Sequence, residues 1–148
     1  TKLSLPTGSI VQYVKCPQSE LLARVSTSSA SWANTGVEFT LTPTDATNRI
    51  VVEGNFSVYI SSNSGVYMAW NDDSNTLMDQ ASIKYKYSQA GWVTIPVRYE
   101  RTAGSTSQLT FQLWWYAYQG NNTLFGWDGG ASGNSQNGHS AWAYEVVE

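Results

Sequence analysis

The chain contains few of the residues on which catalysis and metal binding usually depend. Its 148 residues include a single cysteine, Cys16, and a single histidine, His139. One cysteine cannot form an internal disulfide, and this pair offers too few nitrogen and sulfur ligands for a zinc site. No window approaches the apolar length of a membrane span. We therefore expect no metal, no cofactor and no membrane insertion, and we interpret Cys16 as a small buried apolar residue.

Charged residues are scarce as well, at 13% of the chain. Eight Lys and Arg against 11 Asp and Glu give a net charge of −3, and no basic patch is available to neutralise phosphates. This argues against a nucleic-acid partner. The densest basic cluster is Lys84 and Lys86, on one short predicted strand. Such lysines are typical of an edge strand that is protected against aggregation.

The sequence offers little for catalysis. A Ser-His-Asp triad would have to use His139, which lies in a loop of Gly, Asn and Ser, and no nucleophile elbow is present. Glycoside hydrolysis needs only two carboxylates, and Glu38 and Glu53 lie on the polar faces of two predicted strands. No feature of the sequence marks this pair as buried or shifted in pKa. We expect a non-enzymatic protein.

Alternating apolar and polar residues dominate the chain, and no stretch has a sustained period of 3.6 residues. The longest alternating run, 48–60, predicts a central strand, in which Gly54 marks a bulge or a close backbone approach. Pro96 places the strand 92–100 at a sheet edge or at a bulge. The segment 22–27 favours a strand, with a helical turn over 18–23 as the alternative.

Eight to ten short strands at regular spacing predict an all-β fold, an antiparallel, jelly-roll-like β-sandwich. The main runs are 9–15, 36–42, 48–60, 66–70, 82–88, 92–100, 107–118 and 140–147. Residues 9–148 form one predicted domain, and residues 1–8 form a predicted linker from an upstream stalk.

Aromatic residues are abundant, at 14% of the chain, and several fall on strand faces opposite the predicted core. These outward-facing residues are Tyr59, Trp92, Trp114, Tyr116 and Tyr118. They are either buried between identical subunits or exposed as stacking platforms for a ligand. Because 48–60 and 107–118 have similar lengths, we expect these two strands to be neighbours. We favour a subunit interface for the strand aromatics.

The segment 119–139 is rich in Gly and Asn and carries two aromatic residues. A long loop of this kind is usually functional or disordered, and disordered loops are poor in aromatics. Aromatic faces beside amides are suited to holding a sugar or another polar surface. The predicted ligand contacts are Asn121, Asn122, Phe125, Trp127, Asp128 and Gln136. Trp127 as a plug at the end of the core is the alternative.

A second, weaker ligand patch is predicted at Trp70 and Asp72. Asp72 belongs to a polar run, 71–75, whose oxygens would suit calcium. The run lacks the regular alternation and the distal Glu of an EF-hand loop, so we interpret it as a polar turn.

Four segments, 8–14, 35–43, 48–52 and 141–147, resemble the C-terminal β-sandwich domains of tail-fibre and other virion-surface proteins of bacteriophages, of the marine and cyanophage type. The resemblance implies a homotrimeric domain on a phage tail fibre or capsid fibre, which attaches to a glycan or protein of the host cell surface. It carries over no binding residue, because 71–139 departs from that pattern. A bacterial carbohydrate-binding module or lectin and a purely structural trimerisation domain are the alternatives.

Overall fold

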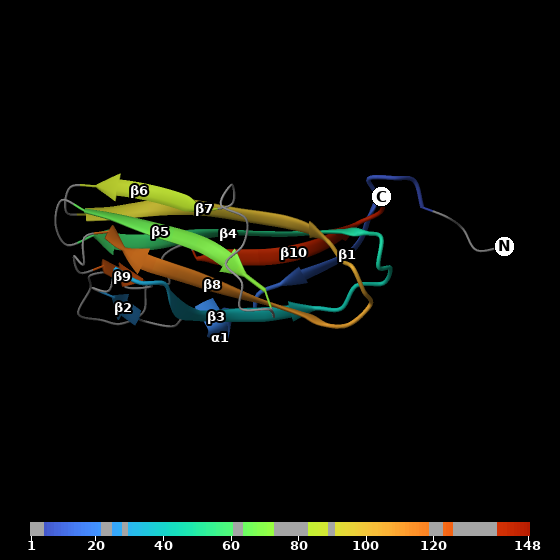
Figure 1. Cartoon of the computed structure of the whole chain (residues 1–148), viewed down its shortest axis with the longest axis horizontal. Coiled ribbons are helices and arrows are strands. Elements are labelled where there is room, and N and C mark those ends of the chain that lie inside the picture. Colours follow the sequence, from blue (N-terminus) through green and yellow to red (C-terminus); the bar gives the residue numbers. More distant parts are fainter. Residues whose placement is uncertain are drawn as a thin grey trace.

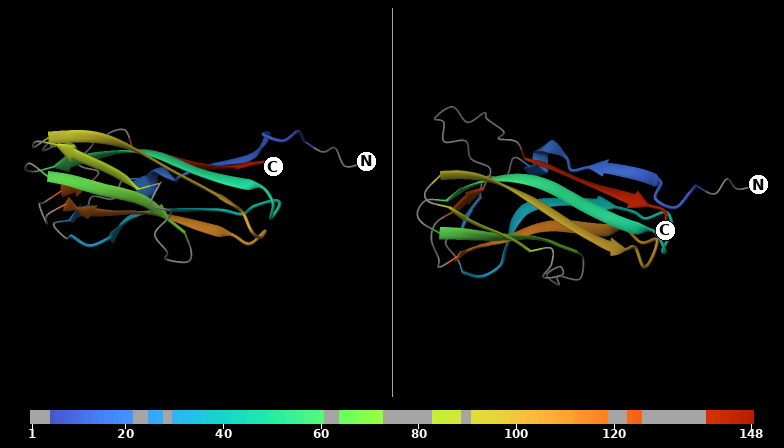
Figure 2. Two further views of the ribbon diagram at one scale, coloured as in Figure 1. Left: turned by 45° about the horizontal axis from the view of Figure 1, so that its top comes forward. Right: turned by 90° about the horizontal axis from the view of Figure 1, so that it is seen from above.

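Two antiparallel β-sheets lie face to face, which confirms the predicted all-β sandwich (Figures 1 and 2). The computed structural model describes residues 5–21, 25–27, 30–60, 64–72, 83–88, 91–118, 123–125 and 139–148. Within these ranges, no helix is both long and apolar enough to cross a membrane.

The chain crosses between the two sheets several times. In chain order the elements are β1 (Ile10–Lys15), α1 (Gln18–Leu21), β2 (Val25–Thr27), β3 (Ala33–Leu41), β4 (Arg49–Ile60), β5 (Ser64–Asn71), β6 (Lys84–Ser88), β7 (Gly91–Thr102), β8 (Leu109–Ala117), β9 (Thr123–Phe125) and β10 (Ser140–Val146). The six-stranded sheet runs β1-β10-β4-β7, with the short β9 beside the last residues of β4 and β2 beside β9. The four-stranded sheet runs β3-β8-β5-β6. This order is that of a jelly roll.

The core lies between the sheets and is centred on Trp70, whose side chain is fully buried. Its ring meets Phe39 and Phe56 edge-on, each at a centroid distance of 5.7 Å. Its indole N–H donates to the Val97 carbonyl of the opposite sheet at 3.2 Å. The prediction that Trp70 contacts a ligand is therefore wrong. The reason is that β5 is covered on both faces, so alternation alone could not assign its outer side.

The central strand β4 pairs with β7 along its whole length and with β10 and β9 on its other side. Gly54 marks a close approach without a bulge, since a Cβ there would lie 2.5 Å from the Phe56 ring and 2.9 Å from the Ser140 carbonyl oxygen. Pro96 is exposed on the edge strand β7, as predicted. The expectation that 48–60 pairs with 107–118 is wrong, because β4 and β8 belong to different sheets. Similar length does not determine whether two strands pair within one sheet or belong to different sheets.

Two smaller predictions have clear outcomes. The strand β6, which carries Lys84 and Lys86, is an edge strand as expected. The segment after Pro17 forms the helical turn α1, which buries Leu21, and the described part of the predicted strand 22–27 is β2.

The first described residues and the C-terminus lie at one end of the sandwich, where β4 begins (Figure 1). There Gly8 N–H donates to the Val147 carbonyl at 2.8 Å, and Val147 N–H donates to the Ser9 carbonyl at 2.9 Å. We call this the terminal end. At the far end β4 finishes beside β9, which pairs with Val58, Tyr59 and Ile60.

A carboxylate, Glu145, is fully buried near the terminal end. It accepts hydrogen bonds from the Thr44 backbone N–H at 2.9 Å, from the Asp45 backbone N–H at 3.1 Å and from the Asn48 amide at 2.8 Å. The Gln12 amide donates to its other oxygen at 2.5 Å. Although burial opposes ionisation, these donors together lower the pKa of Glu145. The charge therefore holds the 42–48 turn against β10.

Candidate functional site

The predicted ligand-binding loop lies mostly outside the described residues. This applies to Asn121, Asn122, Trp127, Asp128 and Gln136. Phe125 is described through its backbone, which ends β9 and pairs with Val58 and Val25. The loop predictions stay predictions, but β9 places this part of the segment at the far end of the sandwich.

Asp72, the second member of the weaker ligand patch, has a structural partner. It is only 9% exposed, and its carboxylate accepts from Arg101 Nη1 at 2.6 Å. This ion pair ties the end of β5 to β7. With Trp70 in the core, the two residues do not form a surface patch.

The five predicted interface aromatics separate into two clusters on opposite outer faces. Tyr59 and Trp92 are register partners on the six-stranded sheet, and their rings meet at 5.4 Å. Trp114, Tyr116 and Tyr118 lie along β8 and its end on the four-stranded sheet. Trp92 is 39% exposed and Tyr118 is 38% exposed.

Aromatic rings form a row across the outer face of the four-stranded sheet, which we call the aromatic row. Its members are Trp32, Tyr67, Tyr85, Tyr116 and Tyr118. Tyr67 lies between its register partners Tyr85 and Tyr116, at 4.4 and 4.5 Å, and the Tyr116 ring is tilted by only 11° from it. Trp32 meets Tyr116 edge-on at 4.8 Å, and Tyr118 contacts Tyr67 at 6.4 Å. Burial raises the pKa of Tyr116. The sequence analysis missed Trp32, Tyr67 and Tyr85, because only the strand register aligns them.

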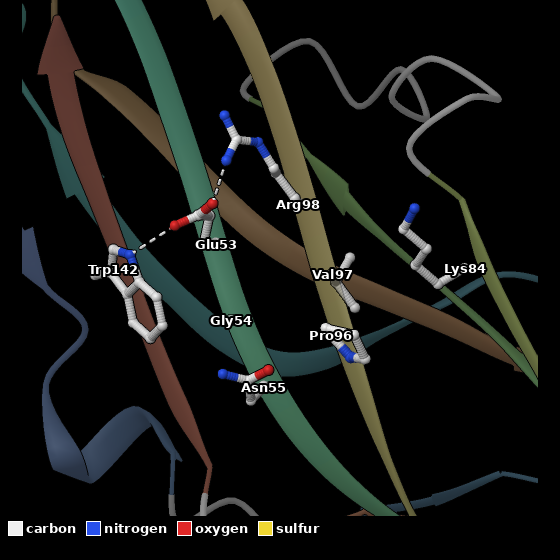
Figure 3. Close-up of a pocket in the computed structure, with 8 residues that line it drawn as sticks. All are labelled: Glu53, Gly54, Asn55, Lys84, Pro96, Val97, Arg98 and Trp142. Atoms are coloured by element: carbon white, nitrogen blue, oxygen red, sulfur yellow. Dashed lines mark hydrogen bonds and ion pairs between the residues drawn. The ribbon is translucent and has the colours of Figure 1, made fainter.

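On the outer face of the six-stranded sheet, a groove of about 380 Å³ crosses β10, β4 and β7 (Figure 3). It is lined by Glu53, Gly54, Asn55, Lys84, Pro96, Val97, Arg98 and Trp142. This volume is at the lower end of the range for small-molecule sites. The sequence analysis named Glu53 as a carboxylate and did not predict the groove.

The polar centre of the groove is the cross-strand set Arg98–Glu53–Trp142. Both outer residues are register partners of Glu53, so the three side chains share one face. Arg98 Nη1 donates to Glu53 Oε1 at 2.5 Å, and the Trp142 indole N–H donates to Glu53 Oε2 at 3.0 Å. Arg98 also donates to Glu100 at 3.0 Å, and this hydrogen bond raises the pKa of Arg98.

The two carboxylates considered for hydrolysis are not brought together. Glu53 lies on β4 of the six-stranded sheet, whereas Glu38 lies on β3 of the other sheet and accepts from the Gln112 amide at 2.6 Å. Each carboxylate belongs to a separate set of contacts.

The remaining reactive side chains are those of His139, which is half-buried, and Cys16, which is buried. His139 Nδ1 accepts from the Ser57 backbone N–H at 3.2 Å, and burial lowers the pKa of His139 to about 4. Cys16 is buried as predicted, and burial together with Glu20 raises its pKa to about 12. Within the described ranges, no three His, Cys, Asp or Glu side chains are placed to hold a metal ion.

No protein-family model matches the chain, and no curated protein matches it. Among solved structures, the C-terminal domain of EclA, a sugar-binding protein, is 14% identical; the match covers 84% of this chain and 79% of that one, with a TM-score of 0.37. The VP2 subviral particle of infectious bursal disease virus is 13% identical, over 93% of this chain and 37% of that one, with a TM-score of 0.31. Mud Crab dicistrovirus is 10% identical, over 93% and 98%, with a TM-score of 0.19. Similarity at this level identifies no family.

Proposed function

We propose that this chain is a non-enzymatic attachment domain of a virion surface, on a phage tail fibre or capsid fibre. It binds a glycan or protein of the host cell surface at the far end of the sandwich. The resemblance of four scaffold segments to virion-surface domains of bacteriophages supports the virion assignment.

The observation that carries the proposal is the separation of the two ends. Residues 8 and 9 contact Val147 where β4 begins, while β8 ends and β9 pairs beside the last residues of β4 (Figures 1 and 2). Tyr59 and Trp92 lie at this same far end. A domain joined to a virion at one end presents the other end to a cell. The predicted ligand segment 119–139 begins at that presented end.

The frame suits recognition more than chemistry. A jelly roll with a well-filled core is a rigid frame, and a preorganised frame favours affinity. Trp127 and Phe125 would supply apolar faces, and the amides of Asn121 and Asn122 would read hydroxyl groups.

We also propose a homotrimer, in which the exposed strand aromatics are interface residues. A cyclic trimer joins two different patches of each subunit. The chain offers two such patches, Tyr59 with Trp92 on one outer face and Tyr116 with Tyr118 on the other. Light scattering of the purified chain tests this directly. A trimer is expected, and a monomer would favour a carbohydrate-binding module.

Trp127→Ala tests the attachment function. We expect binding to host cells, or to a glycan array, to weaken by about tenfold or more, because a central tryptophan often dominates an interface. The matched control is Tyr13→Ala, which removes an exposed aromatic residue near the terminal end. Binding that is equal in the two variants and the wild type would contradict the assignment of the far end.

A purely structural role is the second candidate, and the aromatic row is the observation that favours it. Tyr67 and Tyr116 stack on each other, so their ring faces are not available to a sugar. In that case trimers would form and neither cells nor glycans would bind.

A further inference from the structure

We infer that the groove across β10, β4 and β7 is a binding site for a short acidic oligosaccharide. The site lies on the outer face of the six-stranded sheet, away from the far end, and it does not depend on the proposed attachment function. Figure 3 shows lining residues on the three neighbouring strands β10, β4 and β7, together with Lys84 on β6.

Trp142 provides a fixed apolar platform. Its strand pairs with β4 on one side and with β1 on the other, so the backbone beneath the ring is held on both edges. The indole N–H donates to Glu53 Oε2 at 3.0 Å, which sets the orientation of the ring. The side chain is half-buried, so part of the ring still faces the solvent. A ring held in this way can pack against the C–H face of a sugar without losing rotational freedom.

Hydrogen-bonding capacity remains beside this platform. A carboxylate has about four acceptor positions, and the contacts of Glu53 with Arg98 and Trp142 use one on each oxygen. The guanidinium of Arg98 has five N–H donors, and its contacts with Glu53 and Glu100 leave others available. Asn55 faces the same groove, and its amide makes no hydrogen bond to the described part of the chain. Adjacent donors and acceptors of this kind match the vicinal hydroxyl groups of a sugar.

The charge of the groove determines the sign of its ligand. Arg98 and Glu53 offset each other, which leaves Lys84 as the unmatched charge of the lining. Lys84 is exposed and makes no ion pair with any described residue. A local positive charge on a chain of net charge −3 favours an anionic group at this side of the groove.

The length of the groove requires more than one sugar ring. Neighbouring strands lie about 4.8 Å apart, so β10 and β7 are separated by roughly 10 Å, and Lys84 reaches in from β6 beyond them. A pyranose on Trp142 cannot also place its own acidic group at Lys84. The ligand is therefore a disaccharide or longer, with an acidic group on a residue away from the one that covers Trp142.

The test is isothermal titration of the full chain with oligogalacturonate and with its carboxyl-reduced neutral counterpart. We expect the acidic ligand to bind about fivefold more tightly than the neutral one, as expected for one exposed ion pair. Lys84→Gln should abolish this difference. Trp142→Ala should weaken both ligands by about tenfold or more, and Trp142→Phe should keep most of the affinity because it keeps a ring.

Tyr13→Ala is the matched control, because Tyr13 is an exposed aromatic residue on β1 of the same sheet that does not line the groove. Its affinity for oligogalacturonate should equal that of the wild type. Lys84→Gln keeps the test decisive if Trp142→Ala fails to fold, because Lys84 is exposed. Equal binding of both ligands to the wild type, no binding of either, or an unchanged preference in Lys84→Gln would each overturn the inference. All of these results leave the cell-binding test with Trp127→Ala unaffected.

Discussion

The two outer faces of the sandwich use the same cross-strand geometry with opposite chemistry. On the four-stranded sheet Tyr67 lies between its register partners Tyr85 and Tyr116, and the three rings contact one another. On the six-stranded sheet Glu53 lies between its register partners Arg98 and Trp142, and both donate to it. Each set occupies three neighbouring strands.

The difference lies in what each set leaves available. Stacked rings use their faces on one another, so the aromatic row covers its own sheet and contributes to its stability. A carboxylate between two donors keeps acceptor capacity, and the groove remains beside it. A dense group of aromatic residues is therefore a poorer sign of a ligand site than one tryptophan beside a polar groove.

The largest expected effect concerns the buried charge of the six-stranded sheet. Glu145→Gln keeps the shape of the side chain but removes its charge, and it turns an N–H₂ group either toward the Gln12 amide or toward the donors from Thr44, Asp45 and Asn48. We expect a loss of about 3 kcal/mol in the free energy of unfolding, measured by urea denaturation at pH 7. A loss below about 1 kcal/mol would show that the turn does not depend on the charge.

The same carboxylate predicts a pH dependence. The pKa of Glu145 is lower in the folded chain than its ordinary value of 4.5, so its contribution is complete above pH 4.5 and is lost as the pH falls through the lowered value. The pKa of His139 is about 4 in the folded chain and 6.5 ordinarily, so the unfolded chain binds the proton more readily. The stability of the fold therefore falls as the pH falls from 6.5 to about 4. In a His139→Gln background, the acid loss of stability should therefore begin only below about pH 4.5, and Glu145→Gln should reduce it.

Much of the fold was predictable from local pattern. Alternation predicted the all-β class and the central strand β4, and the missing N–H of Pro96 predicted an edge or a bulge, because these features depend on patterns within single segments. The aromatic row and the groove were not predictable, because they depend on which strand lies beside which and in what register. Trp70 was misplaced because β5 is covered on both faces. Glu145 was missed because a polar residue is normally assigned to the outside, and only its distant donors explain its burial.

Two glycines allow a matched test of interior against surface packing. A Cβ at Gly54 would lie 2.5 Å from the buried Phe56 ring and 2.9 Å from the Ser140 carbonyl oxygen, so β4 or β10 would have to shift. A Cβ at Gly65 would overlap only the ring of Tyr85, an exposed side chain that can rotate away. We expect Gly54→Ala to cost about 2 kcal/mol and Gly65→Ala less than about 1 kcal/mol. Thermal unfolding measures both, and equal losses would contradict the contrast.

The smallest expected effect is that of Arg98→Ala, and its comparison with Tyr116→Ala separates the two outer faces directly. Tyr116→Ala removes the ring that contacts both Tyr67 and Trp32, and aromatic pairs are worth about 1 kcal/mol each beyond the area they bury. Arg98→Ala removes an ion pair whose arginine side chain is 51% exposed, and such pairs contribute about 0.5 kcal/mol or less. Urea denaturation should therefore show a larger loss for Tyr116→Ala, and adding 0.5 M salt should change the difference between wild type and variant only for Arg98→Ala. If Arg98→Ala lost more stability than Tyr116→Ala, the set Arg98–Glu53–Trp142 would stabilise the six-stranded sheet. The hydrogen-bonding groups that we assign to the groove would then already be used within the protein.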